Sequence, residues 1–325
     1  MSGAVGVFIP HLGCPHRCTF CNQNTIADTA LPTPPGKITG ILPPKDAANT
    51  ELAFFGGSFT AIDRDLMKAY LEAGQAYVKR YGLRGIRLST RPDAIDDDIC
   101  EILLSYGVTT VELGAQSMDD AVLTRCERGH TAEDIETAVH CVKQTGMALI
   151  LQMMTGLPGD TDAGALMTAR RLAALKPTGV RIYPTLVLRG SALAKDEGYQ
   201  PQTLEEAVVL CKALVEFFDR EHIPVVKLGL HAEEGYAAGE LVAGPYHPAF
   251  RELVHGEIYL ERAKTALTGL SGAVVLTVGR GRASQLAGQR GQNRKILAAL
   301  PGITSIIIAE DTNIAGFDVV ATGKI

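Results

Sequence analysis

Tryptophan is absent from the sequence, and aromatic residues make up only 6% of its 325 positions, which argues against an extended aromatic stacking surface. No apolar run approaches the roughly 18 residues that a membrane span needs. No basic segment leads into an apolar one near the start, as an export signal would require. The net charge of −5 gives no global reason to expect a nucleic-acid partner.

The seven cysteines are an odd count in a long chain, so a secreted disulfide framework is not expected. Together with the missing export signal, this predicts a cytoplasmic protein that has no membrane partner. Four of the cysteines, Cys100, Cys126, Cys141 and Cys211, are scattered along the chain, and we expect them to be inert buried thiols.

Apolar runs alternate with amphipathic stretches over roughly the first 225 residues, which indicates strands alternating with helices. The expected strands are Val5–Ile9, Glu51–Phe55, Gly85–Ser89, Thr109–Leu113, Met147–Met153 and Val180–Tyr183. The expected helices are Arg64–Tyr81, Asp96–Tyr106, Ala132–Thr145 and Ala163–Ala174. This alternation predicts an α/β fold of about six β/α units around a parallel sheet or barrel. Chemistry in such folds gathers at the carboxyl ends of the strands.

The pattern changes after residue 228, so the expected domains are residues 1–228 and 229–325. A helix is expected at Arg251–Leu267, and strands at Ala273–Val278 and Ile303–Ile308, with a short helical run at Lys295–Leu300 before the second strand. The second domain should therefore be a small α+β appendage.

Three cysteines cluster directly after the first apolar run, at Cys14, Cys18 and Cys21. Thiolates are soft ligands that suit zinc or an iron–sulfur cluster. A zinc site would need a fourth ligand, for which His11 or His16 is available. A cluster of four irons on three cysteines would instead leave one iron open, as a catalytic metal site requires.

Polar and glycine residues follow the later strands. Gly56, Gly57 and Ser58 come after the second strand, where paired glycines let the backbone approach a ligand closely. The alternative is a plain turn in which Ser58 caps the next helix. Glu112 and Gln116 flank the end of the fourth strand, where capping and surface pairing are again the alternative.

The spacing C-x3-C-x2-C, with Phe20 before the last cysteine, resembles the signature of the radical S-adenosylmethionine (SAM) superfamily. Four further segments resemble the radical SAM barrel of the Elongator catalytic subunit family, so that the likeness covers roughly residues 5–215. These segments are Val111–Ser117, Arg128–Thr131, Met154–Gly159 and Arg181–Gly190. The resemblance implies a partial (β/α)6 barrel that binds a [4Fe–4S] cluster and S-adenosylmethionine.

The resemblance also implies roles for individual residues. Cys14, Cys18 and Cys21 would hold the cluster, and Phe20 would lie near the adenine of S-adenosylmethionine. The methionine ammonium would lie near Gly56, Gly57 and Ser58, and the ribose or carboxylate near Glu112 and Gln116, with Arg128 as a further candidate. A side chain at Gly57 should then weaken S-adenosylmethionine binding and leave the cluster in place.

The implied activity is generation of a 5′-deoxyadenosyl radical, with an electron donor such as a ferredoxin or flavodoxin, for base modification of RNA, in particular transfer RNA. The Elongator subunit also carries an acetyltransferase domain, and no segment here resembles a coenzyme A loop. Carboxymethyluridine synthesis by this chain alone is therefore not expected. Two alternatives remain open: a radical SAM enzyme for a small metabolite or tetrapyrrole, and a non-catalytic, metal-stabilised RNA-binding protein.

No residue stands out as a substrate acid or base. His231 and His247 could line a cavity, but a capped or surface position is the simpler interpretation of each.

A basic island lies in the appendage. Seven Lys and Arg residues and no Asp or Glu occur between Arg262 and Ala309, which is a candidate footprint for a polyanion. The order strand, helix, Gly288–Gly291, helix, strand resembles the KH element over 273–308, in which a GxxG loop clamps the RNA backbone. Contact with RNA is therefore expected through residues 279–295. The alternative is a solvated basic face.

Overall fold

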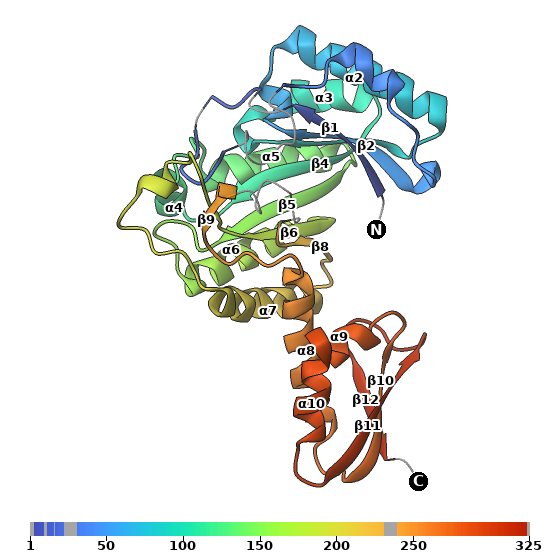
Figure 1. Cartoon of the computed structure of the whole chain (residues 1–325). Coiled ribbons are helices and arrows are strands. Elements are labelled where there is room, and N and C mark those ends of the chain that lie inside the picture. Colours follow the sequence, from blue (N-terminus) through green and yellow to red (C-terminus); the bar gives the residue numbers. More distant parts are fainter. Residues whose placement is uncertain (1–2, 10–11, 16, 23–30, 231–238, 324–325) are drawn as a thin grey trace. The chain divides into compact units, whose positions relative to one another are not determined.

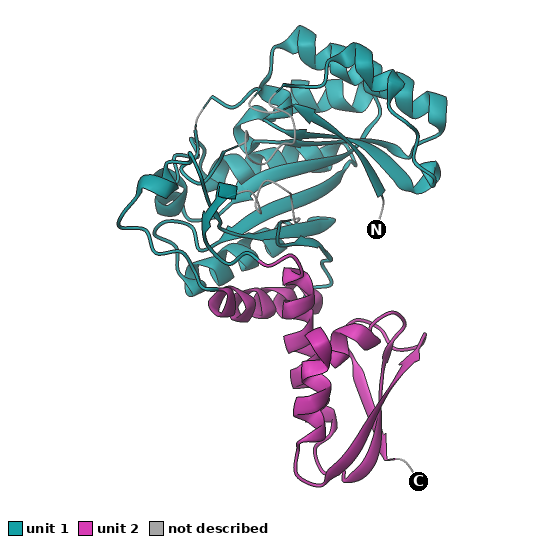
Figure 2. Ribbon diagram, viewed as in Figure 1, with its two compact units in different colours: residues 1–203, 221–246 teal, residues 204–220, 247–325 magenta. Residues whose placement is uncertain are grey.

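The computed structural model describes residues 3–9, 12–15, 17–22, 31–230 and 239–323, which form two compact units (Figure 2). Unit 1 comprises Met1–Thr203 and Glu221–Tyr246, and unit 2 comprises Leu204–Arg220 and His247–Ile325. In the described part of the chain, no helix combines the length and the apolar character needed to cross a bilayer.

A seven-stranded, curled parallel sheet forms the centre of unit 1 (Figure 1). In spatial order its strands are β1 (Gly3–Ile9), β2 (Thr50–Gly56), β3 (Gly85–Thr90), β4 (Val108–Gln116), β5 (Ala148–Thr155), β6 (Gly179–Pro184) and β8 (Val225–Leu228). The connecting segments carry the helices α2 (Arg64–Tyr81), α3 (Asp97–Ser105), α4 (Asp120–Arg125), α5 (Ala132–Gln144) and α6 (Asp162–Ala174). The predicted partial barrel is confirmed, and β8 adds a seventh strand to it.

Local sequence signals explain why the helices begin where they do. The Asp63 side chain accepts hydrogen bonds from two amides in the first turn of α2, and Gly82 ends that helix at a φ of 69°. Thr131 and Asp134 form a reciprocal capping box at the start of α5. On the buried side of α2, Gly74 lets the helix approach the sheet closely, since an added Cβ would lie 3.1 Å from Phe54.

Unit 2 has a three-stranded sheet of its own, in the order β11-β10-β12. Strands β10 (Gly272–Gly279) and β11 (Ile303–Asp311) are parallel, and β12 (Val319–Gly323) is antiparallel to β10. The helices are α7 (Leu204–Arg220), α8 (Phe250–Ala266), α9 (Ala283–Ala287) and α10 (Gln292–Ala298). Side chains from α8, α9, α10 and the sheet share one apolar core, whose members include Tyr259, Leu276, Leu286, Leu297 and Ile306. The predicted α+β appendage is confirmed, and β12 was not predicted.

The division between the units differs from the boundary expected at residue 228. Helix α7 belongs to unit 2, because it packs on α8 and because the Lys212 ammonium lies 2.5 Å from the Glu261 carboxylate. Residues after β8 stay with unit 1: the Gly229 amide donates to the Ile182 carbonyl, and β9 (Leu241–Ala243) pairs with β7 (Val187–Leu188). Each of these pairings joins segments that are far apart in the sequence, so local composition could not reveal the boundary.

Candidate active site

The three clustered cysteines lie in the segment that follows β1, beyond the carboxyl end of that strand. Cys18 is buried, whereas Cys14 and Cys21 are half-buried. Among the described residues, no three His, Cys, Asp or Glu side chains converge on one metal ion. His11 and His16, the candidate fourth ligands of a zinc site, lie outside the described residues, as does His231. Two of the three thiols are therefore partly open to solvent.

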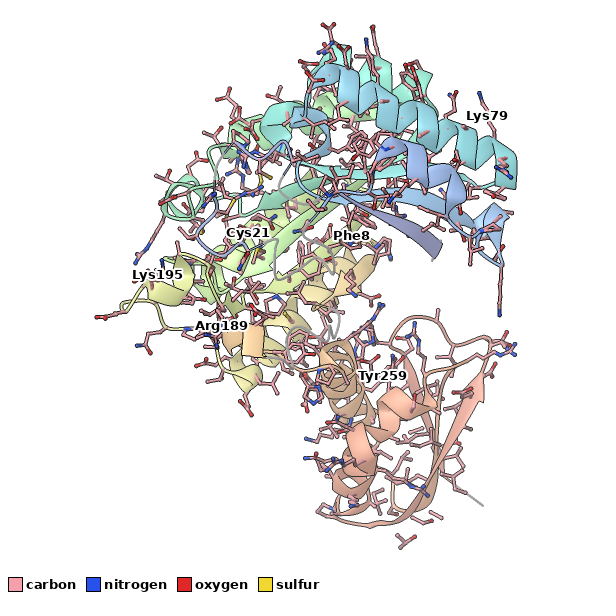
Figure 3. The ribbon with its side chains drawn as sticks, turned by 45° about the horizontal axis from the view of Figure 1, so that its top comes forward. Phe8, Cys21, Lys79, Arg189, Lys195 and Tyr259 are labelled. Atoms are coloured by element: carbon pink, nitrogen blue, oxygen red, sulfur yellow. The ribbon has the colours of Figure 1, made fainter. Side chains whose placement is uncertain are left out.

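Distant segments hold this cysteine loop in place. The Thr19 amide donates to the carbonyl of Cys126 at the end of α4 (3.1 Å), and the Thr19 carbonyl accepts from the amide of Leu193 (2.8 Å). The Asn22 side chain donates to the carbonyl of Arg189 (2.6 Å). Figure 3 labels Cys21 and Arg189 on the same side of unit 1. These distant contacts add to the loop's own hydrogen bond, which the Cys21 amide donates to the Cys18 carbonyl (3.0 Å).

The glycine pair after β2 interlocks with the segment that leads into the cysteines. The Gly57 amide donates to the Ile9 carbonyl and the Ser58 amide to the Leu12 carbonyl, both at 2.9 Å. A Cβ at Gly57 would overlap the Leu12 carbonyl oxygen, and one at Gly13 would overlap the Ser58 carbonyl oxygen. A side chain at Gly57 would thus displace the backbone next to Cys14. From this packing we expect that a side chain at Gly57 also disturbs the cysteine loop, in contrast to the sequence-based prediction that the cluster stays in place.

The other two residues of this motif are also constrained. Gly56 has a φ of 114°, which only glycine adopts easily. The Ser58 hydroxyl is buried and lies 2.9 Å from the Thr90 hydroxyl, and it accepts from the Arg91 amide at 3.2 Å. The side chain of Ser58 therefore ties the end of β2 to the end of β3, and its role toward a ligand stays a prediction.

Arg128 connects the end of β4 to the cysteine loop. Its Nη1 donates to the Cys18 Sγ at 3.1 Å, and its Nη2 donates to the Gly114 carbonyl at 2.7 Å. Gln116 adopts a φ of 67°. Its side-chain oxygen Oε1 accepts from the side-chain nitrogen Nε2 of Gln152 at 3.4 Å. A Cβ at Gly114 would lie 3.0 Å from the side-chain Nε2 of Gln116 and 3.3 Å from Arg128 Nη2. The structure thus brings Cys18, Gln116 and Arg128 together, although 110 residues separate Cys18 from Arg128.

A second layer of charged residues positions Arg128. The Arg91 guanidinium donates to both carboxylate oxygens of Asp93, at 2.9 and 3.0 Å, and to the carbonyl of Arg128. Burial, and then the charges of Arg128 and Arg91, lower the pKa of His130 to about 4. His130 is therefore neutral at pH 7. Its Nε2 lies 3.3 Å from the Ala115 carbonyl.

Glu112 belongs to a different group, a network of charges across the inner face of the sheet. Its carboxylate accepts from Arg181 (2.7 Å), Arg87 (3.1 Å) and the Ser89 hydroxyl (3.1 Å), and its side chain is 2% exposed. Within the described part of the chain, none of its hydrogen bonds reaches Gln116 or Arg128. Direct contact between Glu112 and a ligand stays a prediction.

The same network continues on both sides of Glu112. Arg87 also donates to the fully buried Glu51 at 2.6 and 2.9 Å. Burial opposes ionisation of Glu51, but hydrogen bonds from Thr110 and the Arg87 charge still lower its pKa. Arg181 donates to the Tyr183 hydroxyl at 3.1 Å and lies over the Phe55 ring.

Sequence reasoning had not singled out Arg87 or Arg181 as site residues. The available signal was a charged residue at alternate positions within an apolar strand, which places it on the inner face of the sheet.

Phe20 lies against an apolar cluster at the mouth of the barrel. The cluster consists of Val122, Cys126 and Leu157, and Met154 also packs against it. Burial raises the pKa values of Cys126 and Cys100 to about 12. All four cysteines outside the loop are buried, as expected of inert thiols.

The residues present fit a [4Fe–4S] cluster with one open iron. Three soft ligands lie on one loop, and an arginine donates to one of the sulfurs. The Nε of Arg128, the buried side chain that contacts this sulfur, has no hydrogen-bond partner among the described residues. Buried polar groups without partners mark a place where a ligand is expected to supply them.

Comparison with known proteins gives relatives for the barrel. "Elongator complex protein 3" of Homo sapiens is 33% identical over 140 residues, which are 40% of this chain and 26% of that protein. "tRNA uridine(34) acetyltransferase" of Methanocaldococcus jannaschii is 35% identical over 127 residues, 37% of this chain and 24% of that protein. "Protein YhcC" of Escherichia coli is 28% identical over 198 residues, 56% of this chain and 63% of that protein. The chain thus spans about a quarter of the first two relatives.

Solved structures show the same fold. The archaeal Methanocaldococcus infernus Elp3 with an N-terminal deletion matches with a TM-score of 0.59 and 21% identity, covering 80% of this chain and 64% of that one. Coproporphyrinogen III oxidase (HemN) from Escherichia coli matches with a TM-score of 0.52 and 18% identity, covering 68% and 53%. The family model of the Radical SAM superfamily matches residues 8–172, and that of the Radical_SAM C-terminal domain matches residues 177–260. The chain therefore belongs to the radical SAM superfamily, whose enzymes use a [4Fe–4S] cluster and S-adenosylmethionine.

Proposed function

We propose that this chain is a radical SAM enzyme that modifies a base in RNA, with transfer RNA as the substrate. The observation that carries the chemistry is the contact between Arg128 and Cys18, which joins the cysteine loop to the end of β4. When bound, the cluster and S-adenosylmethionine supply the one-electron chemistry that generates a 5′-deoxyadenosyl radical.

The protein's part is to hold and orient these groups. Cys14, Cys18 and Cys21 are the proposed iron ligands. Arg128 donates to the Cys18 sulfur, and hydrogen bonds to ligand sulfurs help to set the reduction potential of a cluster. The proposed electron donor is a ferredoxin or flavodoxin, and the proposed location is the cytoplasm.

The proposed S-adenosylmethionine site lies between the ends of β2 and β4. The backbone of Gly56, Gly57 and Ser58 is assigned to the methionine ammonium, and Gln116 to the ribose or carboxylate. Glu112 has three protein donors already. We therefore assign it a supporting role, in which it orients Arg181 and Arg87 on the inner face of the sheet.

RNA is proposed as the substrate because of the barrel's relatives. The archaeal relative at 35% identity is named for a transfer-RNA uridine. The basic island of unit 2, which has no Asp or Glu between Arg262 and Ala309, gives independent support for an anionic partner.

Two measurements test this function. Anaerobic reconstitution with iron and sulfide, followed by reduction with S-adenosylmethionine, should yield 5′-deoxyadenosine, and the Cys18→Ala variant should yield none. Mass spectrometry of RNA nucleosides from cells with and without the protein should reveal a modified base that depends on it. Deoxyadenosine formation without any change in RNA would assign the enzyme to a small-molecule substrate. A protein that binds RNA and forms no deoxyadenosine would be non-catalytic.

A further inference from the structure

A cavity in unit 2 lies beside the predicted GxxG loop. Its volume is about 490 Å³, and it is lined by His247, Gln289, Arg290, Gln292 and Lys295. It is an open hollow on the surface, because four of these side chains, Gln289, Arg290, Gln292 and Lys295, are exposed. The two family models end at or before residue 260, so four of the five lining residues lie outside the matched region.

Every side chain that lines the cavity is able to donate a hydrogen bond. Arg290 and Lys295 are cations, and Gln289 and Gln292 carry amide donors. The Nδ1 of His247 accepts from the amide of Ala249 at 3.0 Å. The proton of the neutral ring is therefore on Nε2, which makes that atom a donor as well. No carboxylate lines the cavity.

Within the described part of unit 2, the two cations that line the cavity have no side-chain partner, whereas three other arginines of the unit do. Arg262 pairs with Asp318 at 3.9 Å, and Arg294 donates to the Ile306 carbonyl at 3.1 Å. Arg282 donates to Gln285. Among residues 247–323, Arg290 and Lys295 make no hydrogen bond or ion pair through their side chains. Their charge is therefore available to a ligand.

The loop that carries Arg290 is held in an unusual backbone conformation. Arg290 has a φ of 54°, between Gly288 at 74° and Gly291 at 71°. The buried Asn293 donates to the Gly256 carbonyl in α8 at 2.8 Å. A Cβ at Gly288 would lie 2.6 Å from the Asn293 side chain. A non-glycine residue at positive φ is costly, and its surroundings keep it there, which is common at binding sites.

We propose that this cavity binds phosphate groups of a single-stranded RNA backbone, a site that deepens the proposed function and rests on it for the choice of RNA. The described side chains that line the cavity include two cations and neutral hydrogen-bond donors, but no carboxylate. Such a set favours a negatively charged ligand. No Phe, Tyr or Trp lines the cavity on which a base could stack, so recognition is through the backbone. Binding should therefore depend strongly on salt and little on sequence.

The test is fluorescence anisotropy of a labelled single-stranded RNA oligonucleotide with the reconstituted, full-length protein, titrated at several salt concentrations. The variant is Arg290→Gln with Lys295→Gln. Because each phosphate contact to a single strand contributes about 0.7 to the log–log salt slope, losing two should lower the slope by about 1.4. The dissociation constant at low salt should rise about tenfold or more.

Lys264→Gln is the matched control, because Lys264 is exposed on α8 and does not line the cavity. It removes one positive charge, as each change in the variant does, and should alter RNA affinity less than twofold. Deoxyadenosine formation without RNA should be unchanged in both proteins, since none of these residues belongs to the barrel.

Three results would overturn the site: no RNA binding by the wild type at low salt, equal affinity of wild type and variant, or equal loss in variant and control. Binding of millimolar inorganic phosphate by a wild type that binds no RNA would show a small-anion site instead. The outcomes for the two proposals are separable. A variant with weakened RNA binding supports the site even if no nucleoside change is found, and a nucleoside change with unaltered affinity supports only the proposed function.

Discussion

Glu112 offers a sharp test of the charged network, because the chain contains a surface ion pair of the same length. The Glu112–Arg181 distance is 2.7 Å, and the Glu136–Arg171 distance is also 2.7 Å. Their burial differs: the Glu112 side chain is 2% exposed and that of Glu136 is 48% exposed. Glu112 also accepts from Arg87 and Ser89, so the comparison tests burial together with these additional partners.

The expected cost of Glu112→Gln follows from its partners. Removing one charge of a buried pair typically costs about 3–5 kcal/mol, because the partner is left buried without compensation. In the variant, Arg87 still has its ion pair with Glu51, and Arg181 still has its hydrogen bond to the Tyr183 hydroxyl. We therefore expect the free energy of unfolding to fall by an amount near the lower limit, about 3 kcal/mol. Glu136→Gln should cost less than about 1 kcal/mol, since exposed pairs are screened by solvent.

Thermal unfolding provides the assay. For a unit of this size, 1 kcal/mol corresponds to about 2–4 °C in Tm, so Glu112→Gln should lower the Tm of unit 1 by about 6–12 °C. Glu136→Gln should lower it by less than about 4 °C. Equal shifts in the two variants would refute the reasoning, because they would show that burial adds nothing to this contact.

Three further predictions follow from the loop, the glycine pair and unit 2. Replacing any one cysteine of the C-x3-C-x2-C loop by Ala should abolish iron loading after anaerobic reconstitution, whereas Cys100→Ala should retain it; binding of one zinc without any capacity for a cluster would contradict this. Gly57→Ala should cost about 1–3 kcal/mol and also reduce iron loading, because its Cβ overlaps the Leu12 carbonyl; normal iron content would show that the two segments are independent. Burial, and then two nearby arginines, lower the pKa of His255 from 6.5 to about 4. Unit 2 is therefore most stable above pH 6.5, and its free energy of unfolding falls by about 3 kcal/mol as the pH falls to 4. His255→Gln should remove that loss in denaturant titrations at both pH values and exposed His140→Gln should not; an identical pH dependence of all three proteins would refute the assignment.

The sequence by itself determined the regular elements of the barrel. The predicted helix Arg64–Tyr81 agrees with α2 at both ends, and the six expected strands lie within β1 to β6 or one residue outside them. These agreements have a local cause, because apolar periodicity and capping residues such as Asp63 act within a few positions along the chain. The cysteine loop was equally visible, since its three cysteines fall within eight residues.

Only the tertiary structure decided which residues surround that loop. Arg128 donates to Cys18 across 110 positions, Glu112 is shared by Arg87 and Arg181, and α7 packs in unit 2 rather than unit 1. Parallel strands bring their carboxyl ends together although helices separate them in sequence, so such contacts have no local signature. The order of residues along the chain showed that polar residues follow the strands. The register of the sheet decided which of these residues lie in contact.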